Sequence, residues 1–265
     1  MRTSLFLALL LSGSGSALAQ SAAEVSRTAR EPVFVGYQVE TAVASTYVFR
    51  GIPQYLSLSD PSSQTTALIH LDHVGPGSII ASVWNATALR NFSSQPGNAI
   101  EFDLSAAYSV RLAHRVDLTV GYTAFLYPKQ TAGAPVDGVH EVGISAAYPN
   151  GFITPSIGVY AEVVRQLGAY VVLGGTHDFV RRWLTITPQA DLGVAAYQQY
   201  LGTNHAAPLH LNDVTVALNA KASLPRSFYI SLKASYSYRG TPAELMQPGT
   251  ERNSAYAMLA VGAAR

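Results

Sequence analysis

Residues 228–236 read FYISLKASY, and they alternate between two kinds of side chain. One parity is apolar throughout, from Phe228 to Tyr236, while the other carries Tyr229, Ser231, Lys233 and Ser235. Successive side chains of a β-strand point to opposite faces, so a period of two predicts a strand with one dry and one wet face.

The same period recurs along the chain in runs of about 10–14 residues. An ordinary strand has roughly 5–6 residues, whereas a strand that spans a membrane needs roughly 9–11 residues, so these runs are long enough to span one. A soluble β-sandwich also alternates, so the period alone does not separate the two folds. The expected strands lie near residues 33–49, 65–74, 78–86, 99–110, 116–127, 139–148, 152–163, 169–178, 183–198, 210–223, 228–238 and 253–264.

The connections between these strands favour the barrel over the sandwich. Most connections after odd-numbered strands are long, such as 127–138 and 239–252, while those after even-numbered strands are tight, such as 75–77 and 180–182. Outer-membrane barrels place long loops on one side and short turns on the other. Both ends of the barrel then lie on the short-turn side, which requires an even strand count. We therefore predict an all-β, transmembrane, antiparallel up-and-down β-barrel of about twelve strands.

Composition and the N-terminal segment indicate an exported membrane protein. Only 12% of the residues are charged, against about 25% in a soluble domain, so part of the surface is not expected to face water. Residues 1–19 have the features of a signal peptide: Arg2, the apolar run 5–11 and an A-x-A site at 17–19, with cleavage expected before Gln20. Residues 20–31 are expected to form a flexible lead-in, and 32–265 the barrel domain.

These features place the mature chain in the outer membrane of a Gram-negative envelope. The expected partners are the lipid bilayer, lipopolysaccharide, the barrel-assembly machinery, and small polar solutes or ions. Scattered lysines and arginines give a net charge of +1, without the basic stripe of a nucleic-acid-binding protein. The chain has no cysteine, which excludes disulfides and thiolate metal sites, and no cofactor is expected.

The wet parity collects ionisable side chains, which predicts a charged lumen. The candidate pore-lining residues are Arg50, Asp72, Glu101, Asp103, Glu141, Glu162, Asp191, Asp213, Lys221 and Lys233. They could line a water-filled path, or pair across the interior and plug it. Pairing of the two lysines with Asp191 or Asp213 is expected in either case, because an unpaired buried charge is costly. If the lumen conducts, the excess of acids predicts a mild preference for cations.

Residues 45–54, STYVFRGIPQ, end the first expected strand. Carrying the parity of this strand forward places Tyr47 and Phe49 on the lipid face as girdle residues and Arg50 on the inner face. A bulge within 41–44 would reverse this assignment, because one extra residue exchanges the faces.

The same stretch resembles a signature of the TorF-type porin family, a Tyr-x-Phe-Arg-Gly-Ile-x-Gln string that closes the first strand. Tyr47, Phe49, Arg50, Gly51, Ile52 and Gln54 match it. Thr46 stands where the family usually has aspartate, and Pro53 where it usually has serine. The segments GYTAFLYP at 121–128 and His140-Glu141-Val142 are similar to later parts of the family pattern. The resemblance implies an outer-membrane barrel with a pore function.

Signals for an enzyme or a metal site are weak. The chain has no G-x-S-x-G string and no HExxH motif. The adjacent His140 and Glu141 are the best candidate acid–base pair, yet neighbours on a strand point to opposite faces. We expect a non-enzymatic porin that passes small polar solutes or ions, with no catalytic or metal-binding residue. The alternatives are a non-conducting structural or surface-interaction barrel and an outer-membrane hydrolase.

Overall fold

The computed structural model describes residues 33–50, 52–53, 61–89, 100–112, 115–127, 138–149, 152–164, 168–196, 209–240 and 252–265. The predicted signal peptide, the lead-in and most of the long connections lie outside these ranges. The described elements are β1 (Phe34–Ala44), β2 (Val48–Phe49), β3 (Ile52–Pro53), β4 (Ser62–Val74), β5 (Gly77–Ala88), β6 (Ile100–Leu112), β7 (Val116–Leu126), β8 (Val139–Ala147), β9 (Thr154–Glu162), β10 (Ala169–Thr176), β11 (Phe179–Arg181), β12 (Leu184–Ala196), β13 (His210–Ser223), the 3-10 turn η1 (Pro225–Ser227), β14 (Phe228–Arg239) and β15 (Asn253–Ala264).

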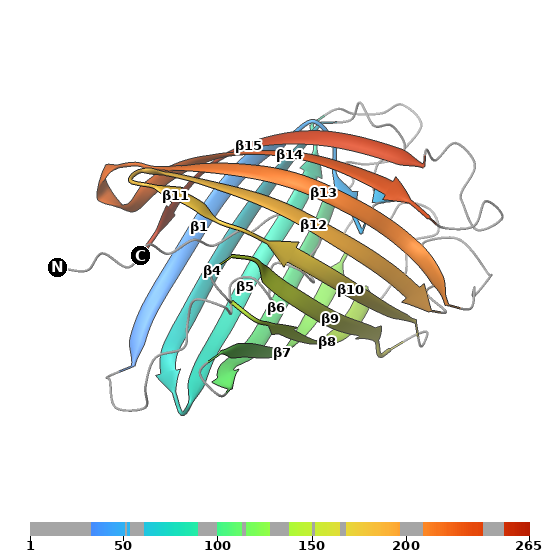
Figure 1. The fold of residues 1–265 in the computed structure, drawn as a ribbon, viewed down its shortest axis with the longest axis horizontal. Helices are drawn as coiled ribbons and strands as arrows, with labels where there is room; N and C mark the ends of the chain where they lie inside the picture. The colour runs from blue at the N-terminus through green and yellow to red at the C-terminus, as the bar shows by residue number, and fades with distance from the viewer. Residues whose placement is uncertain are drawn as a thin grey trace.

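Twelve long strands close into a single antiparallel barrel. The sheet runs in the order β10-β9-β8-β7-β6-β5-β4-β1-β15-β14-β13-β12, and the pairing of β10 with β12 completes the ring. The short strand β11 also pairs with β12, beyond the end of β10. Figure 1 shows the ring with its steeply tilted strands. The predicted fold class and the predicted count of about twelve strands are confirmed.

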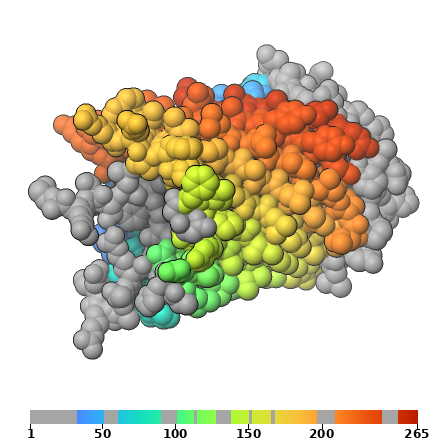
Figure 2. Space-filling model, in the orientation of Figure 1, coloured from blue at the N-terminus to red at the C-terminus, as the bar shows by residue number. Residues whose placement is uncertain are grey.

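The alternation of the sequence becomes an apolar outside and a polar inside. Along β14 every second residue is buried, so that Lys233 is only 1% exposed while Leu232 points outward. Large apolar side chains such as Val216 and Leu218 are about half exposed on the outer wall, and Figure 2 shows part of that wall around β12 and β13. This pattern inverts that of a soluble protein, and it is the pattern of a barrel whose outer face meets lipid.

The described chain ends meet on the side of the short turns. Phe34 lies opposite Asp72, just before the turn at Gly75 with its left-handed φ of 64°, and Gln38 lies opposite Ala264. Both ends of the described barrel therefore lie on the predicted side. Within the described ranges no helix is long and apolar enough to cross a membrane. Expected strand bounds agree closely with those observed, except that the first strand ends at Ala44 and not at residue 49.

Candidate functional site

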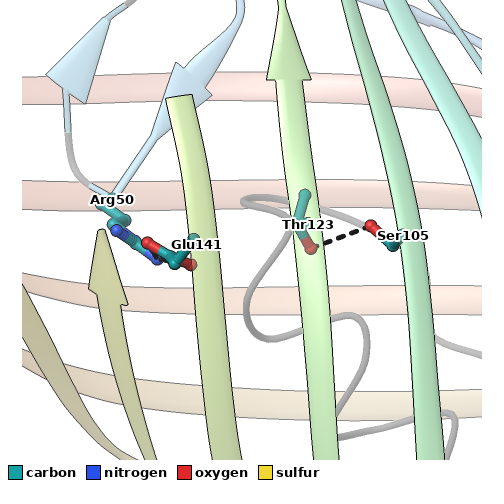
Figure 3. A network of polar contacts seen from close by, with 4 residues as sticks. All are labelled: Arg50, Ser105, Thr123 and Glu141. Atoms are coloured by element: carbon teal, nitrogen blue, oxygen red, sulfur yellow. Dashed lines mark hydrogen bonds and ion pairs between the residues drawn. The ribbon is translucent and has the colours of Figure 1, made fainter. Parts of the chain in front are cut away.

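A small hairpin follows the first strand and lies inside the barrel. Beyond Ala44 the chain bends at Ser45 and Thr46, and β2 then pairs with β3 through Val48 opposite Pro53 and Phe49 opposite Ile52. Arg50 sits at the tip with a φ of 49°, and Figure 3 shows its side chain reaching toward β8. A two-residue connection of this kind needs left-handed backbone, which costs a non-glycine residue about 1–2 kcal/mol.

The assignment of Tyr47 and Phe49 to an outer aromatic girdle is wrong. Tyr47 is 4% exposed and its ring lies 5.1 Å from that of Trp84 on β5, centroid to centroid. The ring of Phe49 lies 5.7 Å from that of Phe125 on β7. The parity of β1 does not continue past the bend at Ser45, so both rings pack against aromatic side chains of the inner wall.

Arg50 is held by an ion pair within the lumen. Its Nη2 atom donates to both carboxylate oxygens of Glu141 on β8, at 2.7 and 2.8 Å, and the two side chains are 5% and 7% exposed. The backbone carbonyl of Arg50 accepts a hydrogen bond of 2.9 Å from Nδ2 of Asn212 on β13. Charge-assisted hydrogen bonds of this length are among the stronger polar contacts in proteins. The hairpin tip thus links strands four places apart in the ring.

Acidic side chains gather on the wall that receives the hairpin. Glu101 and Asp103 lie close together on β6, and the hydroxyl of Tyr47 hydrogen-bonds to Glu101. Asp103 also lies close enough to Glu141 to be repelled by its charge. On the same wall the hydroxyl of Ser105 on β6 and that of Thr123 on β7 form a 2.9 Å hydrogen bond, drawn in Figure 3. Four predicted site residues, Arg50, Glu101, Asp103 and Glu141, are thereby brought together.

The lysines lie on the opposite side, since β6 and β7 face β13 and β14 across the twelve-strand ring. Nζ of Lys221 lies 4.0 Å from the ring centroid of Tyr229, and Nζ of Lys233 lies 5.7 Å from that of Tyr256. Both lysines act electrostatically on Glu40 of β1, and Lys233 also acts on Asp191. Glu40 was absent from the predicted set, although it shares a parity with Gln38 and that parity marks the inner face.

The remaining predicted site residues occupy other places. Asp213 accepts hydrogen bonds from Tyr170, Asn212 and Thr215. Asp72 lies near the short turns, 3.5 Å from Nε2 of His70. Glu162, half-buried at the end of β9, accepts a 3.0 Å hydrogen bond from the backbone of Val164. Asp72 and Glu162 therefore lie apart from both the acidic side chains of β6 and β8 and the lysines of β13 and β14.

Small side chains line the inner wall beside the ion pair. Inward positions of β7 and β8 carry Thr119, Gly121, Thr123, Gly143 and Ser145. Together with Glu141 and Tyr160 they enclose a cavity of about 10 Å³, which has room for about one water molecule.

Comparisons with known proteins match this architecture. An outer-membrane channel from Pseudomonas putida F1 has a TM-score of 0.57 at 13% identity, over 89% of this chain and 97% of that one. The chain has the fold of an outer-membrane β-barrel. The translocator domain of the autotransporter NalP from Neisseria meningitidis has a TM-score of 0.48 at 10% identity, over 88% of each chain. No family model and no curated protein sequence matches the chain.

The barrel separates the two residues of the candidate acid–base pair. Glu141 points into the lumen of this outer-membrane barrel, to Arg50. His140 lies against Tyr122, whose hydroxyl is 2.5 Å from Nδ1 of the imidazole and whose ring is exposed on the outer wall. The geometry gives the pair no shared substrate position, as the alternation of the strand predicts.

Proposed function

We propose that this protein is a porin of the outer membrane, passing small polar solutes or ions along a lumen narrowed by the β2–β3 hairpin. The observation that carries the proposal is the inner wall, which carries buried acidic side chains on β6, β8 and β13 and buried lysines on β13 and β14. Charged side chains that line a pore select among the solutes and ions that pass, whereas a barrel built only to be filled has no need of them.

The small side chains on β7 and β8 support a path along that wall. A barrel of twelve strands is intermediate between the filled eight-stranded barrels and the open sixteen-stranded porins. Glycine, serine and threonine at inward positions leave its interior wider than long side chains would. The protein of similar fold from Pseudomonas putida F1 is described as a channel, which is consistent with the proposal without carrying it.

The docked hairpin favours a second candidate, a barrel that does not conduct. The hairpin contacts β5, β6 and β7 at its base and β8 and β13 at its tip. If this contact is permanent, the barrel serves as a scaffold for surface interactions. We propose no enzymatic activity. We propose that the outer wall contacts lipid and lipopolysaccharide, and that the barrel-assembly machinery is the partner during folding.

The test is single-channel recording of the refolded mature chain in a planar bilayer. Heat-modifiable migration on a gel verifies that the barrel has folded. Stable, ion-selective current steps are the expected result. The porin proposal would be rejected if the folded barrel carries no current, both with the natural sequence and with Arg50 replaced. The scaffold proposal would then remain.

A further inference from the structure

The guanidinium group of Arg50 occupies a cage of aromatic rings and one carboxylate. Its Cζ atom lies 4.3 Å from the ring centroid of Tyr170, 5.3 Å from that of Tyr160 and 4.8 Å from that of Phe49. Glu141 supplies the carboxylate. Rings within about 6 Å of a cation attract it through their negative faces, so this arrangement has the chemistry of a recognition site for an organic cation.

The barrel itself supplies the carboxylate and two of the three rings. Tyr160 on β9 lies over Gly143 and Gly158, where a Cβ atom would come within 2.6 and 2.8 Å of its ring. Tyr170 on β10 lies over Gly193 in the same way, and its hydroxyl donates a 3.0 Å hydrogen bond to Asp213. These positions are fixed by the wall, so the cage does not depend on the hairpin for its shape.

Two further acidic side chains lie near the cage. Glu101 and Asp103 lie on the same side of the lumen, and Asp103 is 3% exposed. Among the described residues Oδ1 of Asp103 has no hydrogen-bond partner. A buried carboxylate oxygen without a donor is costly, so this side of the lumen favours the approach of a cationic donor over that of an anion.

From this geometry we infer that the cage of Glu141, Tyr160 and Tyr170 binds the guanidinium or alkylammonium group of a solute, and that Arg50 is its tethered occupant. The inference deepens the proposed pore function and rests on it, since the solute reaches the cage through the lumen. The guanidinium group of Arg50 occupies the cage, so a solute enters the cage only when Arg50 leaves it. A tethered group has a high effective concentration. Arg50 therefore excludes cations that bind weakly, and it is displaced by cations that are abundant or that bind more tightly.

The test measures binding without measuring current. The refolded full chain in detergent micelles is titrated with methylguanidinium, and saturation transfer from the protein to its methyl protons is followed by NMR. Methylurea, which has nearly the same shape but no charge, is the matched ligand control. Arg50→Gly empties the cage, and glycine suits the left-handed backbone at this position. Arg50→Ala is the second emptied variant, and the double variant Arg50→Gly/Glu141→Gln also removes the carboxylate charge.

The expected result is saturable binding of methylguanidinium to Arg50→Gly, at least about tenfold tighter than to the natural sequence, where the tethered side chain competes. Replacing Glu141 in that background should weaken binding by at least about tenfold, and methylurea should not bind measurably. The inference would be overturned if both folded variants, Arg50→Gly and Arg50→Ala, bind methylguanidinium no more tightly than methylurea. Because no current is recorded, a silent bilayer leaves this result intact, and the two proposals fail separately.

Discussion

Nη2 of Arg50, at the tip of a hairpin inside the barrel, donates to both carboxylate oxygens of Glu141 on the wall at 2.7 and 2.8 Å. The two residues are 91 positions apart in the sequence. This ion pair is the charged contact among those that hold the hairpin docked across the lumen. Removing one partner of a buried pair costs about 3–5 kcal/mol, because the other charge is left uncompensated.

We expect Arg50→Gly and Glu141→Gln each to raise single-channel conductance, because both weaken the anchor of the hairpin. An increase of about twofold or more is expected, since the free energy lost from the docked state corresponds to at least a factor of 100 in its population. Recordings in planar bilayers at constant salt measure the change.

The matched control removes an ion pair elsewhere on the inner wall. Arg111 donates to both oxygens of Asp117 near the short turns, at 2.5 and 2.7 Å, and Arg111→Ala should leave the conductance within the spread of the natural sequence. Equal conductance in Arg50→Gly and the natural sequence would show that the hairpin does not limit the path.

The ion selectivity of the pore should depend on the charged side chains of the inner wall. Acids outnumber bases among the predicted pore-lining residues, so the natural barrel should prefer K⁺ over Cl⁻ modestly, on the order of twofold. Asp103→Asn should reduce this preference and Lys233→Gln should increase it. Reversal potentials in a KCl gradient give both signs directly, and an anion preference in the natural sequence would contradict the prediction.

The barrel could be predicted from the sequence because a period of two runs through most of the long strands. Lys233 is buried and Leu232 exposed, as the alternation of residues 228–236 requires. The hairpin was missed because the parity of β1 was carried through Ser45 and Thr46, where the chain bends. One signal was available: Arg50-Gly51 lies between Phe49 and Ile52, and a glycine-containing pair between two β-formers favours a two-residue turn.

The composition of the site was only partly predictable for a different reason. Parity identified Arg50, Glu101, Asp103 and Glu141 as inward residues, but it cannot say which of them meet across a lumen. The contact of Arg50 with Glu141 depends on a hairpin that leaves the strand. Tyr160 and Tyr170 lie opposite one another on the paired strands β9 and β10, and they meet Arg50 only because the same hairpin reaches them. Such contacts depend on the tertiary arrangement, so they cannot be inferred from the local periodicity of the sequence.

Gly143 should be sensitive to a single added methyl group. A Cβ atom there would come within 2.6 Å of the ring of Tyr160, so Gly143→Ala must displace a packed ring and should destabilise the barrel by about 1–3 kcal/mol. Gly175→Ala is the control, since its nearest neighbour would be a side-chain atom of Ile153 at 3.6 Å, an ordinary contact distance. Equilibrium unfolding in urea, followed by tryptophan fluorescence in vesicles, compares the two variants. Equal stabilities would mean that the ring of Tyr160 moves freely.

The outer wall offers a test of membrane depth with one residue type. Val216 lies near the middle of β13 and is 49% exposed, while Val180 lies on β11 beyond the closed ring and is 55% exposed. If the apolar wall is embedded in lipid, Val216→Arg should destabilise the barrel by about 2–4 kcal/mol and Val180→Arg by about 0–1 kcal/mol, because the cost of a charge falls toward the interface. In water both substitutions at exposed sites would be nearly neutral. Unfolding of the two variants in lipid vesicles therefore separates an embedded wall from a hydrated one, and equal small costs would contradict a membrane-spanning barrel.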